Sequence, residues 1–465
     1  MTEEGNHASS RKLQRLNQEV NAQQRTPVQT LQASANAIKT CRYLKGTSIK
    51  KPPNPDAEGL KAILLHPMNF LLVFLPLGIS SHYYNWGDLP SFWFNFLALV
   101  PLAKILGDAT EELAASLKND MIAGLLNATF GNAVEMVITV NSLRAGLVRI
   151  VKTSLLGSVL SNTLLVLGMS FFFGGIFSIK DKNAGEPEYN PIGAAPEDLS
   201  RESVHSQSKE TKMEVVEEKV QTFSLLGALV NTSMLLVSCL AFSLITVFRA
   251  VLVEEGEDVT AILLPVSRVS SVIIMMAYSA YIFFQLVTHR EAMSDESEDE
   301  GEDATLSALA STAVLCITTL IIAFVSEMMV DTIHGLTENS RMSEHFIGII
   351  LLPIVGNACE HAAAVRFAVQ DKLGLSVSIA VGSSTQIALF VVPLSVIFGW
   401  CMDQSMDLNF GVLNSALITL SVIVVLSMVV DGQSNWLQGY LLCSVYAIIS
   451  VMYWNLPNDV NDGMD

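Results

Sequence analysis

One polar motif occurs twice in this sequence, as Gly131-Asn132-Ala133-Val134-Glu135 and, 225 residues later, as Gly356-Asn357-Ala358-Cys359-Glu360-His361. Both copies lie within apolar stretches. Gly157-Ser158 and Gly382-Ser383 are also 225 residues apart, so the 26-residue spacing from motif to Gly-Ser is the same in both halves. A carboxylate in a lipid-spanning segment is costly and usually functional. Two matched copies therefore predict a duplicated transporter with one central cation site.

The composition indicates a polytopic membrane protein. Of 465 residues, 51% are hydrophobic and only 15% are charged, and the mean hydropathy is +0.44. The apolar residues form runs near the 20 residues that a helix needs to cross a bilayer. The net charge of −18 is concentrated in a few polar segments. The sequence lacks the basic patch with interleaved aromatic residues that is typical of nucleic-acid binding. Its six scattered cysteines predict neither a metal site nor a disulfide framework.

The hydropathy pattern predicts an all-α fold of about eleven transmembrane helices. The first helix is an extra one, and the other ten divide into two sets of five. Because five is odd, the two sets must enter the membrane in opposite orientations, as in many secondary transporters with inverted repeats. The expected spans are 61–82, 91–117, 121–143, 153–178, 222–249, 262–288, 305–332, 344–369, 374–399, 411–430 and 436–454.

The organisation of the chain follows from these spans. The polar residues 1–60 are expected to form a disordered cytosolic tail, with no cleavable signal peptide. The other predicted parts are the extra helix 61–82, a first repeat 83–288 with a polar loop 179–221, an acidic linker 289–304, a second repeat 305–455 and a stub 456–465.

The distribution of basic residues predicts the orientation. The basic tail places the N-terminus in the cytosol, together with the 179–221 loop and the 289–304 linker. One loop disagrees, because Arg144, Arg149 and Lys152 would then lie on the opposite side.

The motif residues predict an oxygen-rich cation site. Asn132 and Glu135 are three residues apart and share a helix face, as do Asn357 and Glu360. Gly131 and Gly356 loosen the helices, so that backbone carbonyls can turn toward the site where they line a cavity. Such ligands suit Ca²⁺, and Mn²⁺ accepts similar ones. Cys359 is expected to point off the Glu360 face, so it is not predicted as a ligand.

Further polar residues are expected near this site. Gln386 is predicted as a site or gate residue, because a buried primary amide needs several partners. His361 is predicted to handle protons, because imidazole titrates near neutral pH. The Gly-Ser spans supply Ser158, Ser161, Asn162, Ser383 and Ser384, of which Ser158 and Ser383 are predicted to take part in proton coupling or gating. Alternatively, the serines only allow close packing of the helices.

An acidic segment precedes the main motif in each half. Glu111 and Glu327 align through the preceding Thr110 and Ser326 and are predicted as entrance ligands or proton acceptors. If they lie at the membrane interface instead, they need no special role, because carboxylates cost less there. Weaker candidates of the same kind are Glu112 and Asp331.

The linker between the two halves carries a run of acids. Residues 291–303 hold eight of them, without the spacing of an EF-hand loop. Such a run is usually a solvated linker, but at this position it is predicted to attract or sense Ca²⁺. The predicted regulatory residues are Asp295, Glu296, Glu298, Asp299, Glu300, Glu302 and Asp303.

This chemistry predicts antiport. Two buried, facing carboxylates hold protons when no metal is bound, and a divalent cation expels those protons. The sequence therefore predicts a transporter, not an enzyme, with Ca²⁺ as substrate, H⁺ as counter-ion, lipid as its surroundings and no cofactor. Alternatives are a Mn²⁺/H⁺ exchanger, a Na⁺/Ca²⁺ exchanger and a channel. A membrane metalloenzyme is a further alternative, but the sequence has no His-Glu-x-x-His arrangement to support it.

The same residues resemble the cation/proton exchanger (CAX) family, in particular its fungal and plant vacuolar Ca²⁺/H⁺ members. The resemblance covers about residues 60–455 and includes the segment 157–168 and Gly382-Ser383-Ser384-Thr385-Gln386. It implies a vacuolar membrane, eleven spans with a dispensable first one, and an acidic helix between the halves. It assigns the central site to Glu135 and Glu360, and supporting roles to Asn132, Asn357, His361, Ser383 and Gln386, with Glu111 and Glu327 at matching acidic positions. Cys359 departs from the alanine common there.

Overall fold

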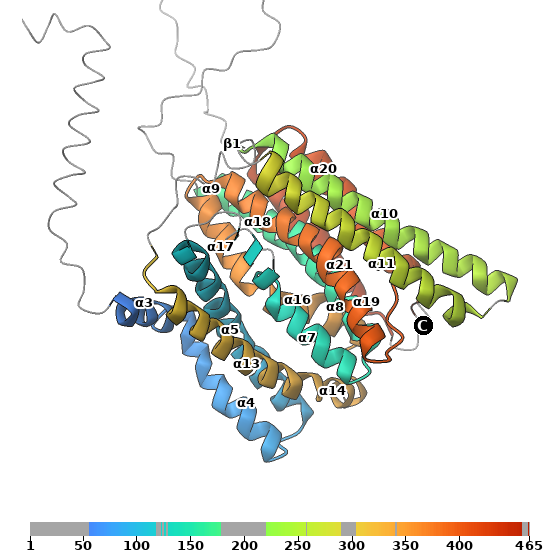
Figure 1. Cartoon of the computed structure of the whole chain (residues 1–465), viewed down its shortest axis with the longest axis horizontal. Coiled ribbons are helices and arrows are strands. Elements are labelled where there is room, and N and C mark those ends of the chain that lie inside the picture. The colour runs from blue at the N-terminus through green and yellow to red at the C-terminus, as the bar shows by residue number, and fades with distance from the viewer. Residues whose placement is uncertain are drawn as a thin grey trace, which may run out of the picture. The chain divides into compact units, whose positions relative to one another are not determined.

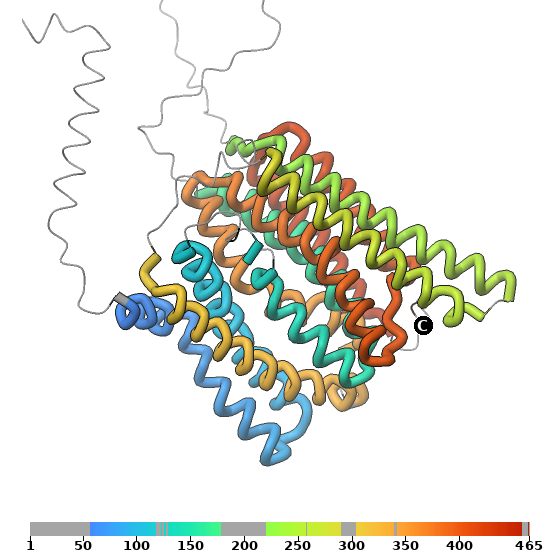
Figure 2. The backbone as a smooth tube through the Cα atoms, viewed as in Figure 1, coloured from blue at the N-terminus to red at the C-terminus, as the bar shows by residue number. Residues whose placement is uncertain are grey.

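The computed structural model of the chain describes residues 55–117, 122, 125–126, 129–177, 220–256, 258–289, 304–339, 342–457 and 464 (Figures 1 and 2). The chain divides into Met1–Glu58 and Gly59–Asp465, and the features below belong to the second unit. Residues 1–54 of the predicted tail, residues 179–219 of the predicted loop and the acidic residues 291–303 lie outside the described residues, as do most of the stub residues. The last residues of the predicted disordered tail, 55–60, are helical, and Gln221 at the end of the predicted loop lies in a short strand.

The described part of the chain is mostly helical. In the first half the elements are α3 (Pro55–Leu64), η1 (Pro67–Val73), α4 (Phe74–Tyr83), α5 (Asp88–Leu117), α7 (Ala133–Arg144), α8 (Val148–Leu160), η2 (Ser161–Val166), α9 (Leu167–Phe177), β1 (Gln221–Thr222), α10 (Leu225–Glu255), α11 (Val259–Phe283) and η3 (Phe284–Thr288).

The second half continues the helical pattern. Its elements are α13 (Ala308–Val330), α14 (Ile333–Asn339), α15 (Glu344–Phe346), η5 (Ile347–Leu351), α16 (Leu352–Gly356), α17 (Ala358–Val369), α18 (Leu373–Gln386), η6 (Ile387–Val391), α19 (Val392–Cys401), α20 (Val412–Val429), β2 (Gln433–Ser434) and α21 (Trp436–Trp454). The short strands β1 and β2 pair antiparallel, with Gln221 opposite Ser434.

Eight described helical spans are long and apolar enough to cross a membrane, and up to ten if each of two bent helix pairs is one span. The expectation of eleven spans is therefore met only in part. The expected span 121–143 is described mainly from residue 129 onward, where its helix is α7. The eight spans are Asp88–Leu117, Val148–Phe177, Leu225–Glu255, Val259–Thr288, Ala308–Glu338, Leu373–Cys401, Val412–Val429 and Trp436–Trp454.

The first expected span is not one straight helix. Asp56–Leu64 and Pro67–Tyr83 meet at an angle of 71°. The break follows from Pro67, which lacks a backbone donor and drives the preceding residue out of the helical region. His66 is accordingly extended, with φ −62° and ψ 140°.

The helix boundaries themselves repeat at the 225-residue interval. α7 and α17 have matching ends, and the turns that follow them match as well. Gly146 and Asp371 occupy equivalent turn positions with φ of +74° and +63°. Aspartate tolerates this left-handed conformation better than most residues, and Asp371 Oδ1 accepts a hydrogen bond from Gln221 Nε2 at 2.7 Å. The duplication seen in the motif therefore extends to the local backbone.

Three groups of helices are visible in Figure 1. One group contains α4, α5 and α13, another contains α10, α11 and α20, and the motif-bearing α7, α8, α17 and α18 lie between them. Two large apolar clusters fill the interior of the described part, and a third, small one contains Ile63, Ile105 and Leu306. One large cluster is built around Phe92, Leu99, Ile322 and Val325 of α5 and α13, and the larger one surrounds α8, α9 and α18. The motif helices thus lie between two packed groups.

Asn141 joins the central helices to the α5–α13 group. From α7 its Nδ2 donates to Ala323 O at 2.9 Å and to Ser326 Oγ at 2.7 Å, both on α13. Interhelical hydrogen bonds in membranes average about 0.6 kcal/mol each. We expect Asn141→Leu to destabilise the protein by about 1 kcal/mol and to lower the melting temperature in detergent by about 2 °C. Ser326→Ala removes one of the two acceptors and should cost less; an equal or larger loss would contradict this account.

Candidate functional site

Both motif asparagines lie at helix breaks. Asn132 precedes the first residue of α7, and Asn357 precedes the first residue of α17. Glu344–Gly356 and Ala358–Val369 meet at 59°. The expectation that each asparagine shares a continuous helix face with its glutamate is therefore modified, because the helix begins after the asparagine. Neither asparagine side chain caps its own helix, which leaves both amides available for other contacts.

The two amides reach across to the opposite half. Asn132 Nδ2 donates to Gln386 Oε1 at 2.9 Å, and Asn132 Oδ1 accepts from Ser383 Oγ at 3.2 Å. Asn357 Nδ2 donates to the Ser158 carbonyl at 3.2 Å. Ser158 and Ser383 are the equivalent serines of the two halves, so the contacts cross reciprocally. The structure thus brings together five predicted residues from four separate helical segments.

Glu360 is held by both halves. Its Oε1 accepts from Ser383 Oγ at 2.6 Å, and its Oε2 accepts from Asn162 Nδ2 at 2.7 Å. Asn162 lies in the π-helical segment η2, whose wider turn interrupts the regular helix, and such segments occur frequently at functional sites. The Glu360 side chain is half-buried, so the carboxylate is fixed in position while the site remains partly open.

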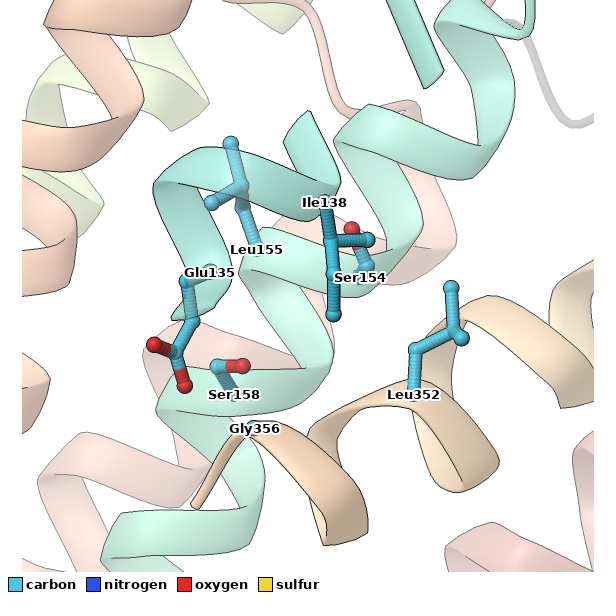
Figure 3. Close-up of a pocket in the computed structure, with 7 residues that line it drawn as sticks. All are labelled: Glu135, Ile138, Ser154, Leu155, Ser158, Leu352 and Gly356. Carbon is cyan, nitrogen blue, oxygen red and sulfur yellow. The ribbon is translucent and has the colours of Figure 1, made fainter. Parts of the chain in front are cut away.

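Glu135 is the more enclosed carboxylate, with only 7% of the residue exposed. It lines a small pocket with Ser158 and Gly356, closed on the apolar side by Ile138, Leu155 and Leu352 (Figure 3). Gly356 approaches it closely, since a Cβ atom there would lie 2.5 Å from Glu135 Oε1. The absence of a side chain at Gly356 in the second motif therefore leaves room for the Glu135 carboxylate of the first motif.

Several acceptor oxygens here lack a donor. Within the described part of the chain, no hydrogen-bond donor reaches the buried Glu135 Oε2, Asn357 Oδ1 or Asn162 Oδ1. Leaving a buried acceptor unpaired costs about 1–3 kcal/mol. Hard cations such as Ca²⁺ bind carboxylate and amide oxygens of this kind. No three His, Cys, Asp or Glu side chains cluster among the described residues, so a cation would depend on the amides as well.

His361 lies at the edge of the network. Its Nδ1 is 2.7 Å from the Asn357 carbonyl. Because a carbonyl oxygen can only accept, Nδ1 carries the proton. Nε2 then faces Ser161 Oγ at 3.4 Å. The imidazole thus contacts both motif halves, and it is half-buried.

The remaining predicted residues take no part in the hydrogen bonds described above. Gly131, Glu111, Glu327 and Asp331 are exposed. Glu112 accepts hydrogen bonds from Thr305 N, Thr305 Oγ1 and Leu306 N, at 2.8–3.0 Å. It therefore ties the end of α5 to the residues that precede α13.

Among the described residues, two lysine–aspartate pairs inside or beside the spanning helices were not predicted from the sequence. Lys152 Nζ of α8 lies 2.9 Å from Asp407 Oδ1. Lys104 and Asp108 form an ion pair within α5. The signal was present, because an ionisable residue inside an apolar span is itself a functional candidate.

The Asn162 contact to Glu360 leads to a testable expectation. We expect Asn162→Ala to weaken cation affinity by about 10- to 100-fold, as loss of a supporting hydrogen bond to a metal-binding carboxylate does elsewhere. The measurement is the concentration dependence of cation uptake into vesicles. Ser384→Ala is the matched control, because Ser384 Oγ donates at 2.8 Å to Ala380 O of its own helix. Equal effects of the two changes would argue against the assignment.

Comparison with known proteins agrees with this arrangement. The sodium/calcium exchanger protein family matches residues 89–287 and 310–455. The chain is 37% identical over 403 residues to vacuolar cation/proton exchanger 3 of Oryza sativa subsp. japonica, covering 84% of this chain and 86% of the relative. It is 33% identical over 400 residues to the vacuolar calcium ion transporter of Schizosaccharomyces pombe, covering 85% and 87%.

A solved structure agrees as well. The Ca²⁺/H⁺ antiporter protein YfkE matches with a TM-score of 0.63 and 31% identity, over 83% of this chain and 98% of that chain. The resemblance to vacuolar cation/proton exchangers that the motifs indicated is thereby confirmed. The chain belongs to the sodium/calcium exchanger family, whose members are secondary transporters and not enzymes.

Proposed function

We propose that this protein is an antiporter that exchanges Ca²⁺ for H⁺ across the vacuolar membrane. The observation that carries the proposal is the reciprocal crossing of the two motifs, in which Asn132 binds Ser383 and Asn357 binds Ser158 O. This crossing gathers Glu135, Glu360 and unpaired amide oxygens at one place. The names of the vacuolar relatives and of the antiporter YfkE support the same substrates and membrane.

The architecture we propose is two inverted five-helix repeats preceded by an extra helix. The helices α17, α18 and α19 each begin 225 residues after α7, α8 and α9, respectively, and this interval supports a duplication. In such transporters the substrate site lies at the repeat interface near the bilayer midplane, and the repeats move around it. The N-terminus would face the cytosol, and residues 295–303 would attract or sense Ca²⁺ there, although these residues lie outside the described part of the chain.

The exchange cycle follows from competition at the two carboxylates. Ca²⁺ binds only when Glu135 and Glu360 are ionised, with Asn132, Asn357, Asn162 and backbone carbonyls near Gly131 and Gly356 as further oxygen donors. When Ca²⁺ leaves, protons replace it, because burial disfavours two adjacent negative charges. His361 and Gln386 are half-buried and contact the network through Asn357 and Asn132, and they would control proton access. No bound cofactor is needed for this cycle.

The energetics allow the exchange. Moving Ca²⁺ against a thousandfold gradient costs about 4.1 kcal/mol, at about 1.4 kcal/mol for each factor of ten. A proton moving down one pH unit returns about 1.4 kcal/mol. Several protons must therefore accompany each Ca²⁺, and any net charge moved against the membrane potential adds to this cost.

The test is Ca²⁺ uptake into sealed vesicles that contain the purified protein, with and without an acid-inside pH gradient. We expect uptake only with the gradient, and its loss when a protonophore is added. Uptake driven by Na⁺ and unaffected by pH would instead identify a Na⁺/Ca²⁺ exchanger. Saturable uptake of Mn²⁺ in preference to Ca²⁺ would identify a Mn²⁺/H⁺ exchanger, and uptake that needs no counter-gradient would indicate a channel.

A further inference from the structure

An ion pair lies near the middle of α5. Lys104 Nζ contacts Asp108 Oδ2 one helical turn away, and the two side chains are 14% and 25% exposed. Both residues belong to the 30-residue span Asp88–Leu117. Charged side chains within spanning helices are costly and rare, and those that occur pair with one another or mark substrate and ion pathways.

The pair lies beside the Glu360 half of the site. Gly107, between the two charged residues, packs against Cys359, because a Cβ atom there would lie 2.7 Å from Cys359 Sγ. Lys104, Gly107 and Glu111 are three and four residues apart and share this face of α5. Cys359 directly precedes Glu360 in α17, so the stretch of α5 that carries the ion pair packs against the turn of α17 that carries Glu360.

The second half has no equivalent pair. Aligning Thr110-Glu111 with Ser326-Glu327 places Leu320 and Phe324 of α13 at the positions of Lys104 and Asp108. Both apolar side chains are exposed, at 71% and 41%. A helix in this structural position can thus be built without the charges, so the ion pair is not a requirement of packing.

We propose that Lys104 and Asp108 form an electrostatic element that sets the affinity of the Glu360 half-site for the divalent cation. They act through the field in a weakly screened interior and not as ligands. The Asp108 carboxylate favours the cation, and the Lys104 ammonium opposes it and promotes release. Because the pair is present in one half only, it makes the two carboxylates unequal. This inference rests on the proposed Ca²⁺/H⁺ exchange.

The experiment compares three variants in the vesicle uptake assay at a fixed pH gradient. Lys104→Met leaves Asp108 unopposed and should lower the KM for Ca²⁺ by about tenfold, with slower maximal uptake. Asp108→Asn leaves the ammonium unopposed and should raise the KM by about tenfold. The double variant restores neutrality and should return the KM to within about threefold of the unmodified protein. A tenfold change in KM corresponds to about 1.4 kcal/mol of cation binding.

Opposite shifts separate this role from a structural one. A pair that only stabilised α5 would make both single variants worse in the same direction, which would overturn the proposal, as would unchanged KM values. Lys104→Arg keeps the charge and should behave as the unmodified protein even if Lys104→Met folds poorly. Glu338→Gln breaks the exposed pair between Glu338 Oε1 and His334 Nε2, 3.3 Å apart, and should change nothing. If the unmodified protein shows no proton-driven uptake, the proposed function fails, independently of the variants.

Discussion

Glu135→Gln and Glu360→Gln should each reduce proton-driven Ca²⁺ uptake by at least about 100-fold. Glutamine keeps the volume of glutamate but removes the charge, and it can neither release a proton to admit the cation nor hold one afterwards. A loss of this size corresponds to about 2.7 kcal/mol in cation binding. It is in the range found when one member of a buried, hydrogen-bonded charge pair is removed. The measurement is initial uptake into vesicles at equal protein content.

The two variants should differ in their effect on folding. The two carboxylate oxygens of Glu360 accept hydrogen bonds from Ser383 and Asn162. The amide of Gln at this position has one oxygen, so it can accept only one of these bonds, and its NH₂ group would face the other donor. Glu135 Oε2 has no donor within the described residues, so Glu135→Gln should leave the melting temperature unchanged or raise it. Normal exchange by either variant would eliminate the central-site assignment.

Gly356→Ala is the second change with a large expected effect. The added Cβ atom would lie 2.5 Å from Glu135 Oε1, well inside the contact distance, so the carboxylate must move. Displacements of about 1 Å in a site can cost about 100-fold in rate. We therefore expect a 10- to 100-fold loss of Ca²⁺ uptake. The amount of protein inserted in the membrane should change little, because alanine is favoured over glycine in helices.

Gly382→Ala is the matched control for this change. Gly382 belongs to the second repeated segment, but its nearest neighbour to an added Cβ atom is Asn231 Nδ2, at 3.9 Å. The variant should retain transport within about twofold of the unmodified protein. If both glycine variants lost transport equally, the loss would reflect helix packing in general and not the approach of Gly356 to Glu135.

Much of the fold could be predicted from the sequence because membrane-spanning helices have a strong hydropathy signal. The spans that became α10, α13 and α21 were expected close to their observed limits. The break before Pro67 was missed, because the apolar run continues across it even though proline excludes a continuous helix. Hydropathy measures solvent preference, and it does not record the direction of the helix axis.

The site was predictable in its residues more than in its contacts. The repeated spacing singled out Asn132, Glu135, Asn357 and Glu360, and the structure gathers them. Which amide binds which carboxylate depends on how the two halves cross, and the sequence carries no measure of that crossing. The same limit applies to Asn162, whose contact with Glu360 depends on the π-helical segment η2. The roles of these residues in transport remain predictions.

The reciprocal contacts of the motif asparagines also bear on assembly. The side-chain hydrogen bonds of Asn132 end on Ser383 and Gln386, and that of Asn357 ends on Ser158. Neither half therefore holds a finished binding site in the absence of the other. A half inserted into the membrane alone would present a lone carboxylate and no closed cage, so a nascent or truncated chain would not become an uncontrolled leak. In the proposed exchanger, the docking of one half onto the other would therefore complete both the fold and the transport site.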